Sequence, residues 1–573
     1  MEMPPLPAPT LPPQAEAFLR SWLTDPTTRQ TAKEQLLQLV NIDTTPKPSP
    51  QACARAEKEA FNAIEQFLTT HSPSVVSRRV PIRPDIADHP DFTLPYYTGQ
   101  TTGPRDNIVR RTYRERGNLL ARWPNPNLPV LALNAHIDTV APHVGGRVEG
   151  DQVHGRGSVD DKGPCVVMML TAWLLDTLAE RFGIRPACEL LLEFVIDEET
   201  GGNGSLSVAL DKTHASADAI LVLECTQLRF HPANRGAVWY FARLDATDTP
   251  GHPPADRDHL LEAMAFAVGS LSQCGDGIKS ESNHPLFPHR PVQTCHGIIG
   301  PHGQHPSRVN DYVPLLLKGT GGLGDGIRLL VDQAVAEYCS RYGDKTRPGT
   351  GDATLKAHTA WTDIAPESAR LEVFGLTGHM GSVDRLDGAI TKAAAIVRKL
   401  VTARREQGPA WAGLTVTLQN RGPLRTLTLE GGQGFLPTHE LDEVCRRMRA
   451  AVEEGVRGYT IREGLPQGAI TCQTTFDKLH NAAFARPADG PAMRAMLHAG
   501  RQTGIYADQP IRGWGASCDA RIFAREFPNA EIVTFGPGHL SQAHANDEHV
   551  NVNELLLAAV TLARVALAFG AHR

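Results

Sequence analysis

The chain has 573 residues, which is enough for three or four domains at roughly 150 residues each. Its 57 Lys and Arg residues nearly balance its 63 Asp and Glu residues, so neither nucleic acid nor anionic lipid is indicated as a partner. No apolar run approaches the ~20 residues of a membrane span. Residues 1–14 are Pro-rich without a signal-peptide pattern, and we expect a disordered tail. Ten cysteines without a CxxC pair favour a reducing compartment, so we expect a cytoplasmic protein.

The first part of the chain alternates predicted helices with predicted strands. Helical spacing covers residues 32–40, 56–68 and 165–178, and strand-like runs cover residues 118–122, 130–134, 190–196, 206–209 and 219–223. Strands that are separated by helices imply an α/β domain with a mostly parallel sheet and helices on both faces. Residues 81–116 are aperiodic, and we expect a long loop or insertion there.

The centre of the chain contains a short motif twice. A strand-like run at 242–245 is followed by Gly251-His252, and a similar run at 369–372 is followed at the same offset by Gly378-His379. A predicted helix follows each copy. The pattern indicates a duplicated α+β, ferredoxin-like unit with halves at 236–350 and 366–460. The alternative is one small domain with a long insertion.

The α/β pattern returns after residue 461. A predicted helix at 492–503 precedes a strand at 531–535 and a terminal helix at 554–569. The sequence therefore predicts a discontinuous catalytic domain, formed by residues 1–235 and 461–573. Residues 236–460 would form an inserted lid or dimerisation domain.

Histidines and carboxylates follow four of the predicted strands. His136 and Asp138 follow the run 130–134, residues 197–199 follow 190–196, Glu224 follows 219–223, and the loop after 531–535 reaches His544. Asp160 lies in a Gly-rich turn before the helix at 165–178. Because ligands bind at the carboxyl ends of parallel strands, we expect these residues to converge on one site.

His and carboxylate ligands without Cys are typical of a catalytic zinc site. Two metals about 3.5–4 Å apart need a bridging carboxylate and further ligands on each side. Asp160 can bridge, and the remaining ligands would be His136, Glu224, Glu199 and His544. Glu198 is then left as a general base beside the metals.

These stretches resemble the di-zinc aminoacylase/carboxypeptidase-G family, which includes succinyl-diaminopimelate desuccinylase, acetylornithine deacetylase and the carnosinase-type dipeptidases. The matching stretches are 36–44 (LLQLVNIDT), 134–140 (NAHIDTV), 155–164 (GRGSVDDKGP), 197–202 (DEETGG), 223–224 (LE), 515–520 (GASCDA) and 536–550 (GPGHLSQAHANDEHV). They occur in both arms of the expected α/β domain.

The resemblance implies two Zn²⁺ ions per chain, with Mn²⁺ or Co²⁺ as substitutes. His136 and Glu224 would hold one zinc, Glu199 and His544 the other, and Asp160 would bridge them. Glu198 would move protons, and Asp138 would orient His136. The Gly-His motif of the lid implies that His379, or else His252, stabilises the oxyanion. The substrate carboxylate would be met by residues among Asn310, Arg385, Arg421, Ser517 and Arg521.

The implied activity is hydrolysis of a peptide bond next to a free carboxylate, by a dipeptidase or a carboxypeptidase. An N-acyl-amino-acid deacylase is the alternative within the family. Residues 160–164 (DDKGP) favour the dipeptidase branch, whereas Glu224 favours carboxypeptidases and deacylases. A doubled lid implies a monomer, and a single lid with an insertion implies a homodimer.

Two rival functions come from other classes. Residues 319–324 (GTGGLG) fit the GxGxxG pattern of dinucleotide-binding oxidoreductases, but the acidic residue that should close a second strand is not evident. A catalytically dead scaffold is the other, and the retained Glu198 argues against it. Cys518 lacks the His and Asn partners of a nucleophile, and we expect it to be a packed small residue. We expect surface or loop positions for the histidines between 284 and 305.

Overall fold

The computed structural model describes residues 11–211, 217–247, 258–319, 324–347, 354–378, 380, 387–406, 411–422 and 425–572. The chain divides into two compact units. The first comprises Met1–Gly236, His284–Pro288 and Lys478–Arg573, and the second comprises Ala237–Asn283 and His289–Asp477. Within the described residues, no helix combines the length and apolar character needed to cross a membrane.

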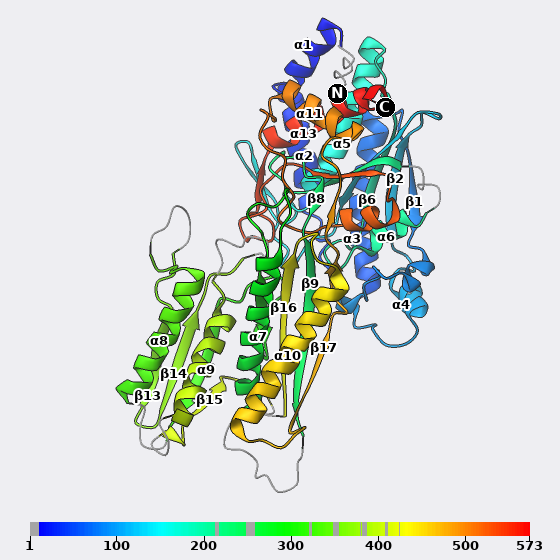
Figure 1. Cartoon of the computed structure of the whole chain (residues 1–573). Helices are drawn as coiled ribbons and strands as arrows, with labels where there is room; N and C mark the ends of the chain where they lie inside the picture. The colour runs from blue at the N-terminus through cyan, green and yellow to red at the C-terminus, as the bar shows by residue number, and fades with distance from the viewer. Residues whose placement is uncertain are drawn as a thin grey trace, which may run out of the picture. The chain divides into compact units, whose positions relative to one another are not determined.

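The first unit is built on a sheet with the strand order β1-β2-β6-β3-β7-β20, of which β1, β2 and β6 are labelled in Figure 1. Its strands are β1 (Val76–Pro81), β2 (Gly117–Trp123), β3 (Val130–His136), β6 (Glu189–Val195), β7 (Ala217–Leu223) and β20 (Glu531–Phe535). β6, β3, β7 and β20 run parallel, and β2 and β1 add antiparallel strands at one edge. β3 and β6 are buried along their whole length, which explains their nearly continuous apolar sequences. The predicted α/β class is confirmed.

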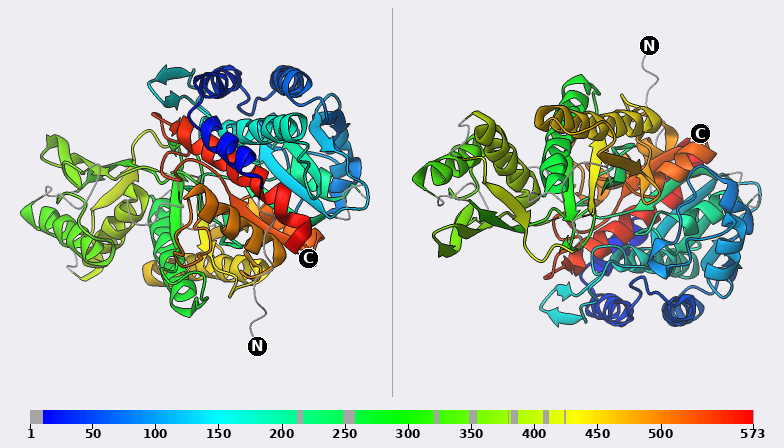
Figure 2. Two further views of the ribbon diagram at one scale, coloured as in Figure 1. Left: turned by 90° about the horizontal axis from the view of Figure 1, so that it is seen from above. Right: turned by 90° about the horizontal axis from the view of Figure 1, so that it is seen from below.

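Helices surround this sheet. They are α1 (Pro13–Trp22), α2 (Pro26–Val40), α3 (Pro50–His71), α4 (Arg105–Thr112), α5 (Lys162–Phe182), α6 (Asn203–Ala209), α11 (Pro491–Thr503), α12 (Ala520–Glu526) and α13 (Val552–Ala568). α5 and α13, both rich in buried apolar residues, pack against each other (Figure 2). Short strands complete the unit, namely β4 (Arg147–Glu149), β5 (Gln152–His154), β8 (Ala233–Asn234), β18 (His480–Asn481), β19 (Phe484–Ala485) and β21 (His549–Asn551).

The second unit contains two sheets, each with its own pair of helices (Figure 1). The first sheet has the order β11-β10-β16-β9-β17 and packs with α7 and α10. Its elements are β9 (Gly236–Ala246), α7 (His259–Glu281), β10 (Thr294–Ile299), β11 (His302–Gly303), β16 (Thr426–Phe435), α10 (Leu441–Glu463) and β17 (Ile470–Thr475).

The second sheet has the order β13-β14-β12-β15 and packs with α9, which in turn contacts α8. Its elements are β12 (Tyr312–Lys318), α8 (Asp325–Tyr342), β13 (Thr359–Ala365), β14 (Ser368–Phe374), α9 (Ala389–Glu406) and β15 (Thr415–Leu418). Both sheets therefore have the βαββαβ order of a ferredoxin-like unit, with the first and third strands in the middle.

The two ferredoxin-like units are nested, which differs from the consecutive halves at 236–350 and 366–460 that the sequence suggested. The inner unit, from β12 to β15, is inserted between β11 and β16 of the outer unit. The second unit also continues beyond residue 460, to Asp477, because β17 pairs with β9.

Three local expectations are corrected. Residues 206–209 belong to the helix α6 rather than to a strand. The segment 81–116 is not an irregular loop throughout, because it contains the 3-10 helices Pro84–Asp88 and Tyr96–Thr98 as well as α4. The last two residues of the expected disordered tail, 13 and 14, begin α1, and residues 1–10 lie outside the described residues.

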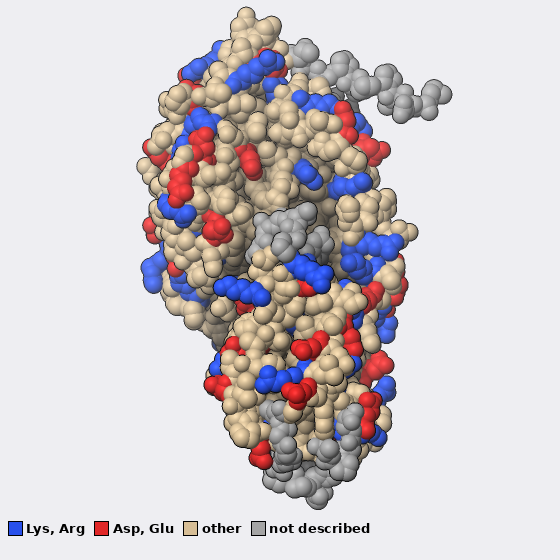
Figure 3. Space-filling model, turned by 90° about the vertical axis from the view of Figure 1, so that its left-hand side faces the viewer, with Lys and Arg blue, Asp and Glu red and all other residues tan. Residues whose placement is uncertain are grey.

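Charged side chains of both signs are interspersed over the face drawn in Figure 3. This distribution agrees with the formal net charge of −6. All ten cysteines are among the described residues, and all are free thiols.

Candidate metal centre

The predicted site residues lie at one edge of the central sheet because β3, β6 and β7 are parallel and in register. His136, the last residue of β3, pairs with Val195 at the end of β6, and Asn134 pairs with Val222 near the end of β7. The turn that begins at Asp197 and the residue Glu224 follow directly. The polar residues that follow these parallel strands thus lie at the same edge of the sheet, as expected from the sequence.

Two groups of potential metal ligands share one carboxylate. His136, Asp160 and Asp161 form the first group, and Asp160, Glu199 and His544 form the second. Nε2 of His136 lies 3.1 Å from Oδ1 of Asp160, and Nε2 of His544 lies 3.3 Å from Oδ2 of the same carboxylate. Nε2 of His544 is also 3.1 Å from Oε1 of Glu199. Each oxygen of Asp160 therefore faces a different histidine, as a carboxylate that bridges two metals must.

The side chains present fit a pair of divalent cations. Nε2 of the buried His136 contacts Oδ1 of Asp160 without the geometry of a hydrogen bond, whereas Nδ1 lies 3.0 Å from the backbone oxygen of Asp138. That arrangement leaves Nε2 available to a metal. Although burial opposes a charged imidazole, the carboxylates of Glu199 and Asp160 raise the pKa of His544 to about 10. The site therefore attracts positive charge.

Glu224 adds a further carboxylate to this site. It is buried directly after β7, with an exposed fraction of 4%. Burial raises its pKa well above the ordinary value, and the negative charges of Asp160, Asp161 and Glu198 raise it further. Such crowding of carboxylates is costly unless cations neutralise them, which again fits a metal centre.

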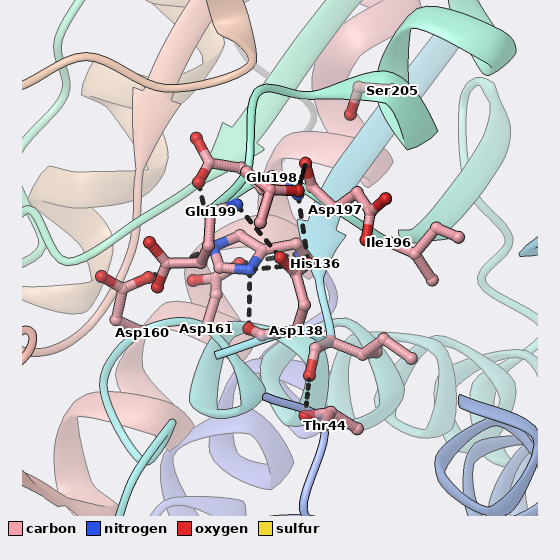
Figure 4. Close-up of polar contacts among 12 residues, drawn as sticks. Thr44, His136, Asp138, Asp160, Asp161, Ile196, Asp197, Glu198, Glu199 and Ser205 are labelled. Carbon is pink, nitrogen blue, oxygen red and sulfur yellow. Dashed lines mark hydrogen bonds and ion pairs between the residues drawn. The ribbon is translucent and has the colours of Figure 1, made fainter. Parts of the chain in front are cut away.

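Glu198 lies beside both ligand groups without belonging to either. Its Oε2 atom is 3.9 Å from Nε2 of His136, and Figure 4 shows the two side chains directed toward the same space. Burial raises the pKa of Glu198 well above its usual value, and the nearby charge of Asp519 raises it further. A carboxyl group with a raised pKa next to potential ligands is suited to accept and return a proton.

Asp138 supports the turn that carries Glu198 and Glu199. Its carboxylate accepts the backbone N–H groups of both residues, at 3.2 Å and 3.0 Å. Nδ1 of His136 donates instead to the backbone oxygen of Asp138 at 3.0 Å, whereas Oδ1 of the Asp138 carboxylate is 3.4 Å away. The backbone oxygen of Asp138 thus contacts His136 while its carboxylate contacts the 198–199 turn, and the role of Asp138 in orienting His136 stays a prediction.

Sequence reasoning missed three acidic residues at this centre. Asp161 accepts the backbone N–H of His136 at 3.1 Å, and Asp519 influences the charge of Glu198. Glu548 accepts the backbone N–H of Asp160 at 3.1 Å. All three lie inside the stretches that carry the family resemblance, but no local pattern distinguishes a carboxylate that holds a loop from one that holds a metal.

Two arginines considered for the substrate carboxylate already have acidic partners. Arg521, in the first unit, lies 3.1 Å from Oδ1 of Asp91 and donates to the backbone oxygen of Gly201 at 3.0 Å. Arg421, in the second unit, forms an ion pair with Asp258. Both guanidinium groups thus contact acidic side chains of their own unit, and their role toward a substrate carboxylate stays a prediction.

The remaining candidates are placed differently. Asn310 lies in the second unit, where its Oδ1 accepts the backbone N–H of Tyr312 at 3.0 Å. Ser517 is half-buried in the segment before α12. His252, His379 and Arg385 lie outside the described residues, as do residues 320–323 of the GxGxxG stretch.

One of the histidines expected on the surface is buried. His296 lies in β10 with an exposed fraction of 1%, and its Nδ1 atom hydrogen-bonds to the hydroxyl of Tyr240. Burial lowers the pKa of His296 to about 3. Cys518 is also buried, with Asn234 donating to its sulfur at 3.2 Å, as expected for a packed residue.

The family model described as peptidase family M20/M25/M40 matches residues 132–568, which is most of the chain. The chain belongs to this family. It is therefore a member of a family of metallopeptidase hydrolases, and the predicted family is confirmed. Membership leaves the dinucleotide-binding alternative without support.

Similar sequences occur among fungal proteins. Probable carboxypeptidases of Aspergillus flavus and Aspergillus oryzae are each 28% identical over 272 residues, which cover 44% of this chain and 59% of the relative. The chain thus spans less than two thirds of the length of these relatives.

Two solved structures resemble the whole chain. Human carnosine dipeptidase 1 is 12% identical with a TM-score of 0.53, covering 97% of this chain and 99% of the other. The dipeptidase Dug1p of Saccharomyces cerevisiae is also 12% identical, with a TM-score of 0.52 and coverage of 97% and 98%. At this identity the likeness shows the fold alone.

Proposed function

We propose that this protein is a two-metal exopeptidase that hydrolyses the peptide bond next to a free C-terminal carboxylate. The observation that carries the proposal is the placement of Asp160, whose two oxygens face His136 and His544. Glu198 lies beside this pair, where a proton carrier is needed. The names of the fungal relatives favour a carboxypeptidase-type activity, and the fold is shared with two dipeptidases.

In this proposal His136 and Glu224 would hold one Zn²⁺ ion, Glu199 and His544 would hold the other, and Asp160 would contribute a ligand to both. When bound, such a metal pair supplies Lewis-acid activation of the scissile carbonyl and of the attacking water. Asp138 and Asp161 keep His136 and the 198–199 turn in place through the hydrogen bonds described above.

Glu198 moves the proton that the reaction requires. Its carboxylate takes a proton from the attacking water, whose oxygen forms a new bond to the amide carbon. The same carboxyl group then protonates the leaving nitrogen as the C–N bond breaks. Water is consumed, and a carboxylate and a free amine are released. We further propose that His379 donates a hydrogen bond to the developing oxyanion, with His252 as the alternative.

The proton-carrying role is tested by Glu198→Gln, with Glu193→Gln as a matched control. Glu193 is another buried carboxyl group, but it lies in β6 and hydrogen-bonds to Asn134 at 3.0 Å. We expect Glu198→Gln to reduce kcat by about 10²–10⁴-fold while the zinc content per chain is unchanged. Glu193→Gln should retain near wild-type turnover. If Glu198→Gln keeps most of its activity, the role assigned to Glu198 is wrong.

The substrate class is tested with one panel of peptides. Dipeptides, longer peptides with free C-termini, the same peptides with amidated C-termini, and N-acyl amino acids are compared with and without a chelator. We expect cleavage of peptides with a free carboxylate, loss of cleavage on chelation, and recovery with Zn²⁺, Mn²⁺ or Co²⁺. Equal cleavage of amidated peptides, or activity that survives chelation, would contradict the proposal.

Two further properties belong to the same proposal. Because one chain carries two sheets of the same βαββαβ order, we infer that the protein works as a monomer, which light scattering can measure. Ten free cysteines support a reducing, cytoplasmic environment.

A further inference from the structure

The segment 81–116 lies against the turn that carries Glu198 and Glu199. Thr93 and Asn203 exchange two hydrogen bonds, from Thr93 N to Asn203 Oδ1 at 3.2 Å and from Asn203 Nδ2 to Thr93 O at 2.7 Å. Gly201 is so close to Thr93 that an added Cβ would lie 2.3 Å from its Oγ1 atom. The segment is therefore fitted to the 197–203 turn.

Asp197, the residue before Glu198, receives three donors at its side chain. The hydroxyls of Tyr97 and Tyr113 each lie 2.6 Å from Oδ2, and Nη2 of Arg116 lies 2.6 Å from Oδ1. All three donors belong to the 81–116 segment, and Asp197 is 2% exposed. Burial keeps the pKa of both tyrosines well above the ordinary value, so their hydroxyls remain protonated donors.

The backbone of Asp197 is left-handed, with φ of 62°, a region that Asp adopts more often than most residues other than Gly. Few residues other than Gly adopt that region without a local stabilising contact. The backbone oxygen of Asp197 also accepts the N–H of Gly202 at 2.7 Å, which closes the turn. The conformation of Asp197 sets the direction in which the chain leaves β6, and hence where Glu198 and Glu199 begin.

Arg116 connects this contact to the body of the unit. Its guanidinium binds Glu57 of α3 through Nε at 2.8 Å and Nη2 at 2.6 Å, in addition to Asp197. Arg116 and Glu57 are only 4% and 6% exposed. Because buried charge pairs of this kind tolerate little displacement, the segment forms a fixed support behind the turn.

We propose that the 81–116 segment is a positioning element for the general base, with Tyr97 and Tyr113 as positioning residues that act through Asp197. Asp138 accepts the backbone N–H groups of Glu198 and Glu199. The tyrosines hold the preceding residue through its carboxylate. This inference rests on the proposed function, because it explains how Glu198 is held in the position that a general base requires.

The test is the double variant Tyr97→Phe/Tyr113→Phe, with Tyr96→Phe as the matched control. Phenylalanine keeps both rings but removes the two hydroxyls from Asp197. Tyr96 lies in the same 3-10 helix, where its ring faces the ammonium group of Lys478 instead. We expect the double variant to lower kcat about 10- to 100-fold, since small misplacement of a reacting group has effects of that size. KM and zinc content should stay near wild-type values, whereas Tm should fall modestly, because a buried carboxylate loses two hydrogen-bond donors.

A second measurement does not depend on activity. In the metal-free protein, amide hydrogen exchange in peptides covering residues 197–203 should be faster in the double variant than in wild type or Tyr96→Phe. If wild type is active and the double variant has the same kcat and the same exchange rates, the inference is overturned while the proposed function stands. A double variant that loses zinc would show damage to the metal centre as a whole, which also overturns it. If wild type itself cleaves none of the peptides, the proposed function fails, and the exchange result alone then decides whether the tyrosines hold the turn.

Discussion

The loop that carries Asp160 depends on one buried carboxylate, Glu548. Its Oε1 atom accepts the backbone N–H groups of Gly157, Val159 and Asp160 at 3.0, 2.9 and 3.1 Å. Its Oε2 atom binds Nη1 of Arg156 at 2.6 Å. Both side chains of this ion pair are at most 2% exposed. We therefore expect Glu548→Gln to have a large effect on stability, even though Glu548 is not a predicted ligand.

The size of the effect follows from these contacts. Glutamine fills nearly the same volume, but its NH₂ group must face either Arg156 or the three backbone donors, so one set loses its acceptor. Hydrogen bonds to a charged group contribute about 1.5–3 kcal/mol each. Breaking a buried ion pair from one side costs about 3–5 kcal/mol, because the other charge is left without a partner. Since these contributions overlap, we expect the free energy of unfolding to fall by about 3–5 kcal/mol.

The assay is urea unfolding of the chelator-treated protein, so that metal binding does not contribute. Wild type, Glu548→Gln, Arg156→Met and the double variant form a cycle that separates the pair from its surroundings. The double variant should lose less than the sum of the two single variants, because neither charge is then left alone. A Glu548→Gln protein within about 0.5 kcal/mol of wild type, or strictly additive losses, would refute the reasoning.

Two further predictions concern the metal centre and the second unit. Asp160→Asn should bind substantially less zinc per chain than wild type, measured by metal analysis after dialysis, because a single carboxylate is expected to serve both ions; an unchanged stoichiometry would contradict the bridging role. His296 should make stability depend on pH, because burial lowers its pKa to about 3, below the 6.5 of an ordinary histidine. Below about pH 6.5 the unfolded chain binds a proton at His296 that the folded chain does not bind. The contribution of the neutral, buried His296 to the free energy of unfolding is therefore complete above about pH 6.5 and is lost as the pH falls toward 3. His296→Gln should show a shallower fall in Tm between pH 7 and pH 4, and an unchanged slope would contradict the assignment.

The metal centre could be anticipated from sequence because each of its parts has a local signal. His136, Glu224 and the turn after β6 all follow apolar runs, and the parallel arrangement of those runs brings their ends together. The contacts of Asp197 have no such signal. Tyr97 and Tyr113 lie in an aperiodic segment, 100 and 84 positions before Asp197 respectively. A contact at that separation depends on the completed fold, so the purpose of the segment could not be inferred.

The strand expected at 206–209 shows a different limit. A short apolar run is compatible with either a buried strand or a buried helix, and the residues around it decide between them. Here Gly201 and Gly202, both with positive φ, turn the chain immediately before α6. The short helix that follows is buried on all sides, so its apolar pattern carries no helical period.

The nested arrangement of the second unit explains why the repeated motif indicated two similar units correctly but their order along the chain wrongly. The copies at 242–245 and 369–372 lie in β9 and β14, the first strand of the outer unit and the third strand of the inner unit. In a βαββαβ unit, the first and third strands are neighbours in the middle of the sheet, so both positions require a similar buried strand. Similarity between them therefore indicates that two such units exist but not how the chain passes between them. The order is decided by β16, which pairs with β10 although the whole inner unit lies between them in the sequence. The entropic cost of closing a loop rises only with the logarithm of its length, so pairing β16 with the distant β10 adds little to the cost of folding. No local stretch of sequence indicates this pairing.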